Sequence, residues 1–398
     1  MNILHVNIRA SQGGAGQVAL DLHRRLILQG VNSRFLYGYA SGIKDDGHVI
    51  NEPDIRRLGT KTSVLANYLA HRLAGLDPFT GNKELLHEWI EWADLVHMHA
   101  PHHYYLNWNY FLRELTQARK PLVITAHDWW FITGRCGFTE DCTGWKRTCG
   151  ECGLRRQRDL PSLLDLSRRH RVVKLEGIAR LGKAVHFVCP SNHLADDYRK
   201  VLSSSIDVIP NSVDLTFERY ISSINCAETK REGFLFSASD LSSPGKIDAD
   251  LVRELSNRRD VRITLAGRNN PFRNDGAVYL GEIKSRTAMA DVFRDSLALI
   301  FCSRMDNAPL TIIEALVSGC FVAAYESPAA QESLARVGGR CVRDREEMLQ
   351  VITQNRVSEL YGNIDRAELI RRARQVYFGA VADSYVQAYR KMLVSTWQ

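Results

Sequence analysis

The chain has 398 residues, enough for two or three domains, and its 45% apolar and 24% charged residues are typical of a globular protein. No apolar run approaches the ~20 residues of a membrane-spanning helix. Residues 1–10 look like a first strand and not like a signal peptide, so we expect a cytoplasmic protein. The net charge of +7 permits binding to nucleic acid, anionic lipid or phosphorylated substrates and selects none of them.

Strand-like and helix-like patterns alternate along the whole chain, which predicts an α/β fold with parallel sheets. In the first half we expect helices at 18–29 and 85–92, and strands at 3–7, 34–37, 95–99, 122–125 and 187–189. In the second half we expect strands at 234–238, 261–266, 278–280, 297–301 and 321–324, and a helical tail from residue 367. These halves predict two Rossmann-like domains, residues 1–212 and 213–377, that face each other across a cleft.

A glycine-rich turn follows the first expected strand. Gly13, Gly14 and Gly16 precede or open the helix at 18–29, where backbone N–H groups can approach a phosphate or a sugar closely. A strand-to-helix turn also uses glycine for conformational reasons alone, so this signal is weak. Dinucleotide binding is disfavoured because no Asp or Glu ends the second strand.

Histidines gather near the end of the strand at 95–99. His97 and His99 share one face of that strand, and His102 and His103 follow in the next loop. A metal site is disfavoured because the nearest carboxylate, Asp94, lies at the opposite end of the strand and no cysteine is close. We therefore expect that this strand end contacts a bound ligand instead.

His127 comes just after the strand at 122–125, and Asp128 is its neighbour. A histidine at the carboxyl end of a parallel strand is placed to contact a ligand. The alternative is a buried histidine that holds Asp128 or a backbone carbonyl, and both roles can be true together.

Four of the nine cysteines fall within seventeen residues, namely Cys136, Cys142, Cys149 and Cys152. Four thiolates suit a tetrahedral Zn²⁺ ion, and the second pair has chelate spacing, although five residues separate the first pair. We predict one structural zinc ion, since four protein ligands leave no open position for catalysis. A reduced cluster without metal is the first alternative, and a pair of disulfides, disfavoured in an intracellular chain, is the second.

A basic segment runs from Leu154 to Lys174, with seven basic residues against two acidic ones. The basic residues are Arg155, Arg156, Arg158, Arg168, Arg169, Arg171 and Lys174, and the interleaved leucines are Leu160, Leu163, Leu164 and Leu166. Such a segment can lie on an anionic membrane surface. The alternative is a helix with leucines in the core and a solvated charged face.

Two loops of the second half carry cations suited to a diphosphate. Lys246 follows the strand at 234–238, and Arg268 follows the strand at 261–266. A fixed cation can balance the negative charge of a phosphate group. The alternative is that both are ordinary surface cations.

Residues 301–322 are the most informative stretch, because a strand, a polar loop and a helix follow one another there. Ligands of open α/β sheets bind at the carboxyl ends of strands, and a helix start offers N–H groups to an anion. We therefore expect ligand contacts from Asp306, Asn307, Ala308, Pro309 and Leu310. Glu314 can accept two ribose hydroxyls, and its apolar neighbours mean that its charge needs a partner.

At these residues the chain resembles the retaining glycosyltransferases of family 4. That family has a Glu, seven residues and then Glu-Ala-Leu or similar, and Asp306 and Glu314 occupy these positions. The segments at 123–130, 208–214 and 240–246 resemble the family in the same order, so the resemblance covers nearly the whole chain. It is strongest to enzymes of colanic-acid-type exopolysaccharide synthesis, which have a similar Cys-rich insert, here residues 134–155.

The resemblance implies a glycosyltransferase B-type fold in which residues 378–398 pack back on the first domain. It implies that His127 lines the sugar pocket, that Lys246 grips the donor diphosphate, and that Gly14 approaches the donor or the acceptor. It also implies catalysis without a metal ion or cofactor.

We therefore expect transfer of a hexose, with retention, from a UDP- or GDP-sugar to a polyprenyl-diphosphate-linked or oligosaccharide acceptor in exopolysaccharide or O-antigen synthesis. Such an enzyme would contact the inner face of the cytoplasmic membrane peripherally. One alternative is a nucleotide-sugar epimerase of the same fold, which needs further carboxylates that the sequence does not show. Another is a zinc-containing nucleic-acid-binding protein, which leaves Lys246, Asp306 and Glu314 unexplained, so we expect no nucleic-acid partner.

Overall fold

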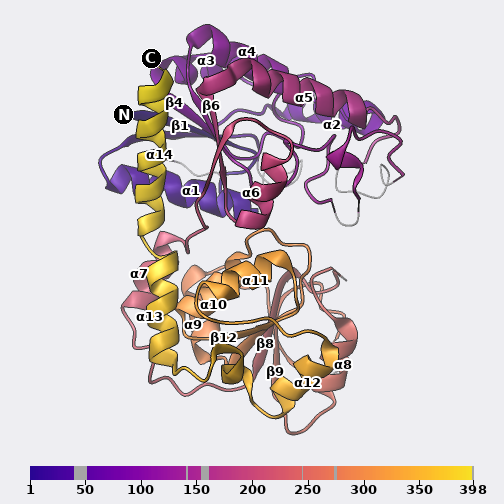
Figure 1. The fold of residues 1–398 in the computed structure, drawn as a ribbon, viewed down its shortest axis with the longest axis vertical. Coiled ribbons are helices and arrows are strands. Elements are labelled where there is room, and N and C mark those ends of the chain that lie inside the picture. Colours follow the sequence, from indigo (N-terminus) through magenta and orange to yellow (C-terminus); the bar gives the residue numbers. More distant parts are fainter. Residues whose placement is uncertain (40–51, 140–141, 154–160, 244, 273–275, 397–398) are drawn as a thin grey trace. The chain divides into compact units, whose positions relative to one another are not determined.

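The computed structural model describes residues 1–39, 52–139, 142–153, 161–243, 245–272 and 276–396. The chain divides into two compact units. Unit 1 comprises Met1–Pro210 and Ala382–Gln398, and unit 2 comprises Asn211–Val381 (Figure 1). The predicted boundaries were 212/213 and 377/378, so the structure places the first division two residues earlier and the second four residues later.

Unit 1 is built on a seven-stranded parallel sheet with the order β3-β2-β1-β4-β5-β6-β7. Its strands are β1 (Asn2–Asn7), β2 (Asn32–Tyr37), β3 (Ile55–Arg57), β4 (Leu95–Met98), β5 (Leu122–Thr125), β6 (Val185–Cys189) and β7 (Ser205–Val208). Its helices are α1 (Gly13–Leu28), α2 (Lys61–Ala74), α3 (Lys83–Trp92), α4 (Trp108–Ala118), α5 (Ser167–Leu181), α6 (Asn192–Arg199) and α14 (Ala380–Thr396), with short 3₁₀ turns at Gly144–Lys146 and Gly182–Ala184.

Unit 2 is built on a five-stranded parallel sheet with the order β10-β9-β8-β11-β12. Its strands are β8 (Phe234–Asp240), β9 (Ile263–Arg268), β10 (Val278–Gly281), β11 (Ala298–Phe301) and β12 (Phe321–Ala324). Its helices are α7 (Leu215–Ser222), α8 (Ala249–Ser256), α9 (Arg286–Asp295), α10 (Leu310–Val317), α11 (Pro328–Ala335), α12 (Arg345–Thr353) and α13 (Arg366–Tyr377), with a 3₁₀ turn at Val357–Tyr361.

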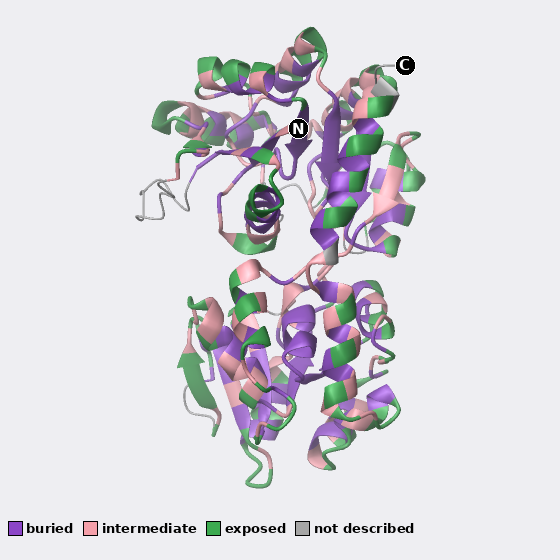
Figure 2. Ribbon diagram, turned by 90° about the vertical axis from the view of Figure 1, so that its left-hand side faces the viewer, coloured by how far each residue is buried: buried purple, intermediate pink, exposed green. Residues whose placement is uncertain are grey.

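The central strands are buried on both faces. Every residue of β4, β5, β6, β11 and β12 is buried, and Figure 2 shows helices whose exposed sides face away from buried strands. Parallel strands covered by helices on both faces need apolar residues at every position, and this is why the expected strands are continuous apolar runs. The predicted fold class, two Rossmann-like parallel α/β domains, is confirmed.

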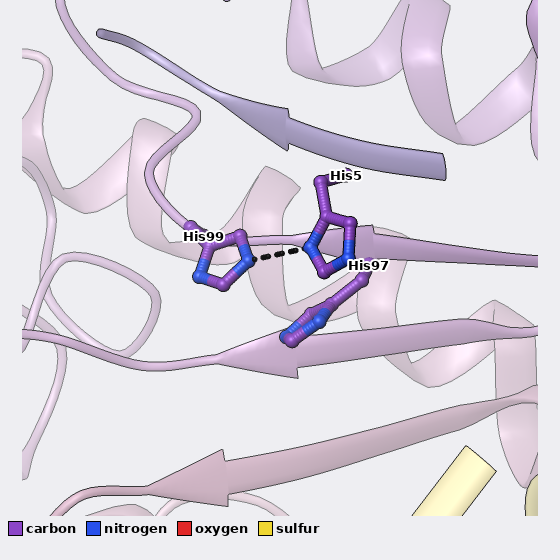
Figure 3. Close-up of side chains that lie close together, drawn as sticks. All are labelled: His5, His97 and His99. Atoms are coloured by element: carbon purple, nitrogen blue, oxygen red, sulfur yellow. Dashed lines mark hydrogen bonds between the residues drawn. The ribbon is translucent and has the colours of Figure 1, made fainter. Parts of the chain in front are cut away.

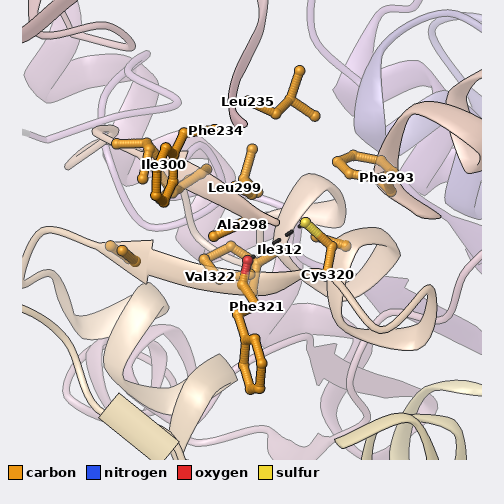
Figure 4. Close-up of a cluster of buried hydrophobic side chains, with 14 of the residues drawn as sticks. Phe234, Leu235, Phe293, Ala298, Leu299, Ile300, Ile312, Cys320, Phe321 and Val322 are labelled. Carbon is orange, nitrogen blue, oxygen red and sulfur yellow. Dashed lines mark hydrogen bonds between the residues drawn. The ribbon is translucent and has the colours of Figure 1, made fainter. Parts of the chain in front are cut away.

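Figure 4 shows part of the unit 2 core. Strand residues such as Leu235, Leu299 and Val322 are fully buried and belong to the same cluster as Phe293 of α9 and Ile312 of α10. These helices are therefore held by side chains of the central strands, and their first residues are fixed at one edge of the sheet.

Each sheet has one point where the strand order reverses. In unit 1 the chain runs outward from β1 through β2 to β3 and then continues on the other side of β1 with β4. In unit 2 it runs outward from β8 to β10 and continues on the other side of β8 with β11. The loops that leave the two strands at such a point diverge, and the space between them is the usual ligand site of an open α/β sheet.

The last helix, α14, completes unit 1. Its Tyr389 hydroxyl contacts His97 Nδ1 at 2.7 Å, and its Tyr385 hydroxyl contacts Thr125 Oγ1 at 3.0 Å. Both tyrosines are buried. At the surface, Gln29 Nε2 donates to Asp383 Oδ1 at 2.8 Å. No helix among the described residues is long and apolar enough to cross a bilayer.

Replacing Tyr389 by Phe should lower the free energy of unfolding of unit 1 by about 1–3 kcal/mol, because a buried polar atom of His97 loses its partner. All seven tryptophans belong to unit 1, so their fluorescence during urea unfolding reports this unit. Tyr68→Phe, at a tyrosine that is 38% exposed, is the matched control and should leave the midpoint unchanged. Equal midpoints for the two variants would contradict the anchoring role of Tyr389.

Candidate active site

Glu314 of α10 is buried, with an exposed fraction of 5%, among the buried side chains of Ile312, Ile313, Ala315 and Leu316. The partner that its charge requires is Arg286. The Arg286 guanidinium donates from Nη2 to Glu314 Oε1 at 2.5 Å.

Arg286 has a second carboxylate partner. Its Nε donates to Asp214 Oδ2 at 2.5 Å, and its guanidinium carbon lies 5.2 Å from the ring centroid of Phe217. Asp214 also caps α7 by accepting from the Phe217 N–H at 3.0 Å. Burial raises the pKa of Glu314, and Arg286 opposes that rise. One cation therefore lies between two acids at the base of the α10 loop.

Lys246 and Asp306 meet at the switch point of unit 2. Lys246 lies in the loop after β8, Asp306 lies in the loop after β11, and β8 and β11 are neighbours. Lys246 Nζ donates to Asp306 Oδ1 at 2.5 Å, and both side chains are partly exposed, at 32% and 25%. Two residues sixty positions apart, each predicted to contact a donor, thus form an ion pair at the expected edge of the sheet.

The loop from Asp306 to Pro309 leads into the first turn of α10. Asn307 is buried, and the Ala308 carbonyl accepts a hydrogen bond from Asn211 Nδ2 at 3.1 Å. Pro309 is the N-cap residue of α10, and no side chain caps this helix. The first turn of α10, which includes Leu310, therefore has backbone N–H groups that no cap side chain occupies, and such a helix start attracts anions.

Arg268 lies apart from these contacts. It ends β9, its side chain is 57% exposed, and it lies 3.6 Å from Glu282 while donating from Nε to the Ser239 carbonyl at 3.2 Å. Nothing in this arrangement links it to Lys246 or Asp306, so a donor contact from Arg268 stays a prediction.

In unit 1, histidines form a buried row across the switch point. His5 of β1 lies beside His97 of β4, because the two strands pair in register (Figure 3). His5 Nδ1 lies 3.2 Å from His99 Nε2, and His99 Nδ1 lies 3.2 Å from His127 Nε2. The predicted residues His97, His99 and His127 are thus neighbours. His5, which was not predicted as a site residue, joins them from the first strand, which was predicted at 3–7.

His127 is adjacent to a second polar group. Asp128 accepts from the Trp130 N–H at 2.8 Å, and its other carboxylate oxygen lies 3.2 Å from His102 Nε2. The Asp128 carbonyl accepts from the Tyr198 hydroxyl at 2.7 Å. Asp128 is therefore held by Trp130, His102 and Tyr198, and the His127 ring contacts the histidine row through Nε2.

The histidines of this row are kept neutral. Burial lowers the pKa of His127 to about 4, and burial together with neighbouring histidines lowers the pKa of His5 and His99 well below the usual value. A neutral imidazole has one N–H donor and one acceptor nitrogen. Each contact in the row therefore fixes the tautomer of the next ring, and the row orients His127.

Among the described residues, His5, His97 and His99 are the group whose nitrogens lie close enough to share a metal ion, all within 4.8 Å of one another. Two observations favour a hydrogen-bonded row over a metal site. Both ring nitrogens of His97 already contact hydroxyl groups, those of Tyr389 and Thr125. The three residues are also fully buried with no carboxylate in the group to balance a divalent charge.

The predicted zinc ligands are all described, and none of the four forms a disulfide bond in the structure. Cys136, Cys142, Cys149 and Cys152 do not form a group with three sulfur atoms within 4.8 Å of one another. Cys149 to Glu151 are three successive residues with positive φ, and Cys149 Sγ accepts from the Gly134 N–H at 3.3 Å. The arrangement adds no support for zinc, which stays a prediction.

The glycine-rich turn lies at the switch point of unit 1. Gly13 has a φ of +73°, a conformation that glycine adopts readily, and it is the first residue of α1. Gly14 is exposed in the first turn, and no side chain caps the helix. Backbone N–H groups are thus available at the end of β1, where a ligand contact from Gly14 was predicted.

Comparison with known proteins gives the family. The model described as Glycosyltransferase Family 4 matches residues 12–217. WcaC of Escherichia coli K12, named as a colanic acid biosynthesis glycosyl transferase, is 32% identical over 416 residues, which cover 98% of this chain and all of that one. This chain belongs to glycosyltransferase family 4.

Solved structures share the fold. Sucrose-phosphate synthase from Thermosynechococcus elongatus matches 99% of this chain and all of that chain, with a TM-score of 0.64 and 14% identity. HepE from Anabaena, solved in complex with UDP, matches 99% of this chain and all of that chain, with a TM-score of 0.61 and 15% identity. At these identities the likeness establishes the glycosyltransferase B-type fold and no residue role.

Three residues of these sites escaped sequence reasoning, namely His5, Asp214 and Arg286. Asp214 ends the segment 208–214, which resembles the family, but nothing in that segment indicates the partner of the Asp214 carboxylate. Arg286 opens α9 behind a loop with no distinctive pattern. The buried charge of Glu314 indicates that a basic side chain lies beside it, but the sequence does not indicate which residue supplies that side chain.

The neutral histidines make a pH prediction for unit 1. The folded pKa of His127 is about 4 and its ordinary value is 6.5, so between these values the unfolded chain binds a proton that the folded chain does not. Stability is therefore full above pH 6.5 and falls as the pH is lowered, by up to about 1.4 kcal/mol per pH unit for each such histidine. Urea unfolding followed by tryptophan fluorescence between pH 7.5 and 5.0 measures this slope.

His99→Gln is the informative variant, since glutamine hydrogen-bonds without titrating in this range. Its free energy of unfolding should depend less steeply on pH than that of the natural chain. His87→Gln, at an exposed histidine on α3, is the control and should keep the natural slope. A slope unchanged by His99→Gln would contradict the neutral buried row.

Proposed function

We propose that this family 4 glycosyltransferase, a relative of WcaC, transfers a hexosyl group from a nucleotide-sugar donor to a saccharide acceptor, with retention of configuration. The observation that carries the proposal is the unit 2 switch point, where Lys246 pairs with Asp306 in the loop that leads into the uncapped start of α10, the helix that carries the buried Glu314. A cation, free N–H groups and a carboxylate are the groups that a diphosphate and a ribose require.

In the proposed donor complex, Lys246 and the first N–H groups of α10 contact the diphosphate. The Lys246–Asp306 pair is partly exposed, so an incoming diphosphate competes with Asp306 for the ammonium group. As the glycosidic bond breaks, negative charge grows on the diphosphate, and a cation already fixed at the switch point stabilises it. Asp306 keeps Lys246 in place before the donor arrives.

Glu314 contacts the ribose in this proposal. Arg286 holds its carboxylate through Oε1, and a buried acid paired in this way keeps its charge and its direction. The second oxygen is then available to the ribose hydroxyls. This assigns Arg286 and Asp214 to positioning and Glu314 to the contact itself.

His127 contacts the hexose. Burial keeps its ring neutral, so the ring brings no positive charge to the sugar. The reaction needs no metal ion in this proposal, because Lys246 and the α10 N–H groups meet the charge of the leaving group. The acceptor side, including Gly14, lies in unit 1.

The proposed acceptor is a saccharide, carried on a polyprenyl diphosphate, in exopolysaccharide synthesis. The naming of WcaC as a colanic acid biosynthesis glycosyl transferase supports an exopolysaccharide pathway. The UDP complex of HepE supports a UDP-sugar donor, with a GDP-sugar as the alternative. A lipid-linked acceptor calls for peripheral attachment to the cytoplasmic membrane, which the exposed part of the basic segment favours.

A donor panel tests the function. The purified full-length protein is incubated with UDP- and GDP-hexoses and polyprenyl-diphosphate saccharides, and released nucleoside diphosphate is measured together with the anomeric configuration of the product by NMR. We expect release that depends on the acceptor and a product with the anomeric configuration of the donor. Acceptor-independent conversion of the sugar would identify an epimerase, and no turnover with any donor would contradict the proposal.

Glu314→Gln should weaken binding of the nucleoside diphosphate by about 10- to 100-fold, because a charged hydrogen bond to ribose is worth ~1.5–3 kcal/mol. Isothermal titration of UDP and GDP against the purified variant measures this. Glu332→Gln removes a comparable Glu–Arg pair on α11 and is the matched control, with natural affinity expected. Natural affinity and turnover in Glu314→Gln would refute the ribose contact.

A further inference from the structure

Helix α2 carries its apolar side chains on the outside. Leu65, Tyr68, Leu69 and Leu73 are 48%, 38%, 60% and 54% exposed. Their spacing of three and four residues places them on one face of the helix. A surface helix of a globular protein normally turns such a face toward the core, so the orientation of α2 is reversed.

Buried polar groups fix this reversed orientation. Asn67, on the inner face, donates from Nδ2 to the carbonyls of Phe79 at 2.7 Å and Tyr104 at 2.9 Å, and its Oδ1 accepts from the Phe79 N–H at 2.9 Å. His71, also on the inner face, contacts Asp77 Oδ1 at 3.2 Å. Turning the leucines inward would break all four contacts, so their exposure is built into the structure.

A second segment extends the apolar face. The N–H groups of Leu163 and Leu164 donate to the carbonyls of Arg72 and Leu73, at 2.9 and 2.8 Å, so these two leucines lie against the end of α2. Their side chains are 57% and 52% exposed. Leu76 and Phe79 follow α2 directly and are 44% and 50% exposed. We call Leu65, Tyr68, Leu69, Leu73, Leu76, Phe79, Leu163 and Leu164 the α2 leucine surface.

The charges around the α2 leucine surface are basic. Lys61 and Arg72 are exposed on α2 itself, which contains no acidic residue, and Arg168 and Arg169 are exposed at the start of neighbouring α5 (Figure 1). The nearby carboxylates are engaged, since Asp77 contacts His71 and Asp165 accepts from the Cys152 N–H and the Ser167 hydroxyl. An apolar face with a basic border matches the headgroup and acyl boundary of an anionic bilayer.

This surface only partly overlaps the basic segment that the sequence predicts as a membrane contact, because it shares Leu163 and Leu164 and the bordering Arg168 and Arg169 but is centred on α2. Arg155, Arg156, Arg158 and Leu160 lie outside the described residues. Arg171 donates from Nε to the Ile132 carbonyl, and Lys174 is buried against Trp130, so neither side chain projects from the α5 surface as predicted. Leu163 and Leu164 are exposed, contrary to the alternative in which the leucines of this segment fill the core.

We propose that the α2 leucine surface is the membrane-docking site of this protein, inserting its leucines below the headgroups of an anionic bilayer while Lys61, Arg72, Arg168 and Arg169 contact the headgroups. The inference rests on the proposed function in one respect, that a lipid-linked acceptor requires the enzyme to work at a bilayer. Its own test needs no substrate.

Vesicle sedimentation of the full-length protein tests the docking site. Vesicles of phosphatidylethanolamine with and without phosphatidylglycerol are used at low and high salt. The triple variant Leu65→Gln, Leu69→Gln, Leu73→Gln should lose at least ~10-fold in partition coefficient at both salt concentrations, since insertion of apolar groups is not screened. Arg168→Gln with Arg169→Gln should weaken binding mainly at low salt and only on the anionic vesicles.

The matched control is Ile27→Gln, Leu28→Gln, Val394→Gln, which replaces three helical side chains of unit 1 with similar exposure, 42%, 61% and 64%. It should bind vesicles as the natural chain does. A tryptophan at position 69 (Leu69→Trp) should be quenched by bromine-labelled acyl chains above the level of the natural chain, and Leu28→Trp should not.

Several results would overturn the docking site. One is equal partition of the leucine triple variant and the control. Another is a natural chain that does not bind vesicles and forms a dimer, while the leucine triple variant is a monomer. That result would make the surface an interface between proteins. UDP titration separates the two proposals. The leucine triple variant should bind UDP with natural affinity. If the donor proposal fails, the natural chain would not bind UDP but would still bind vesicles.

Discussion

Burial of both faces of the parallel sheets is the constraint on which the rest of the structure depends. Helices cover both faces of the central strands, so ligand chemistry has room where these strands end, and the reversal of strand order selects one such place in each unit. In unit 2 that place holds the Lys246–Asp306 pair, and the helix that follows Asp306 carries the buried Glu314. In unit 1 it holds the histidine row and the glycine turn before α1.

The central strands and their loops could be predicted because their signal is local. A strand buried on both faces is a continuous apolar run, and the residue that follows it must lie at the sheet edge, which is how Asp306 and Lys246 were found. Strands β3 and β7 escaped prediction because they are short and lie at the edges of the sheet, where β7 is only partly buried. Their sequences therefore carry no strong apolar pattern.

The partners of the predicted residues could not be derived, because they depend on strand order. His5 meets His99 only since β1 and β4 are neighbours, although 94 positions separate the two residues. Arg286 lies 28 positions before Glu314 and 72 after Asp214, and each of these separations passes through other elements. Helix α2 is a further case. Its regular apolar spacing predicts that the leucine face is buried, and only the polar contacts of Asn67 and His71 show that the opposite face lies inside.

The contacts of α14 have a consequence for biosynthesis. Unit 1 joins residues 292 and 260 positions apart, through His97 with Tyr389 and Thr125 with Tyr385, and all of unit 2 is synthesised between them. Closing so long a segment is slow, whereas unit 2 is one continuous stretch that can fold as it emerges from the ribosome. The first domain to be translated is thus the last to be finished. Until the seventeen residues of α14 dock, the side of unit 1 that contains the buried histidines stays uncovered, and at this stage chaperones and proteases can bind the chain.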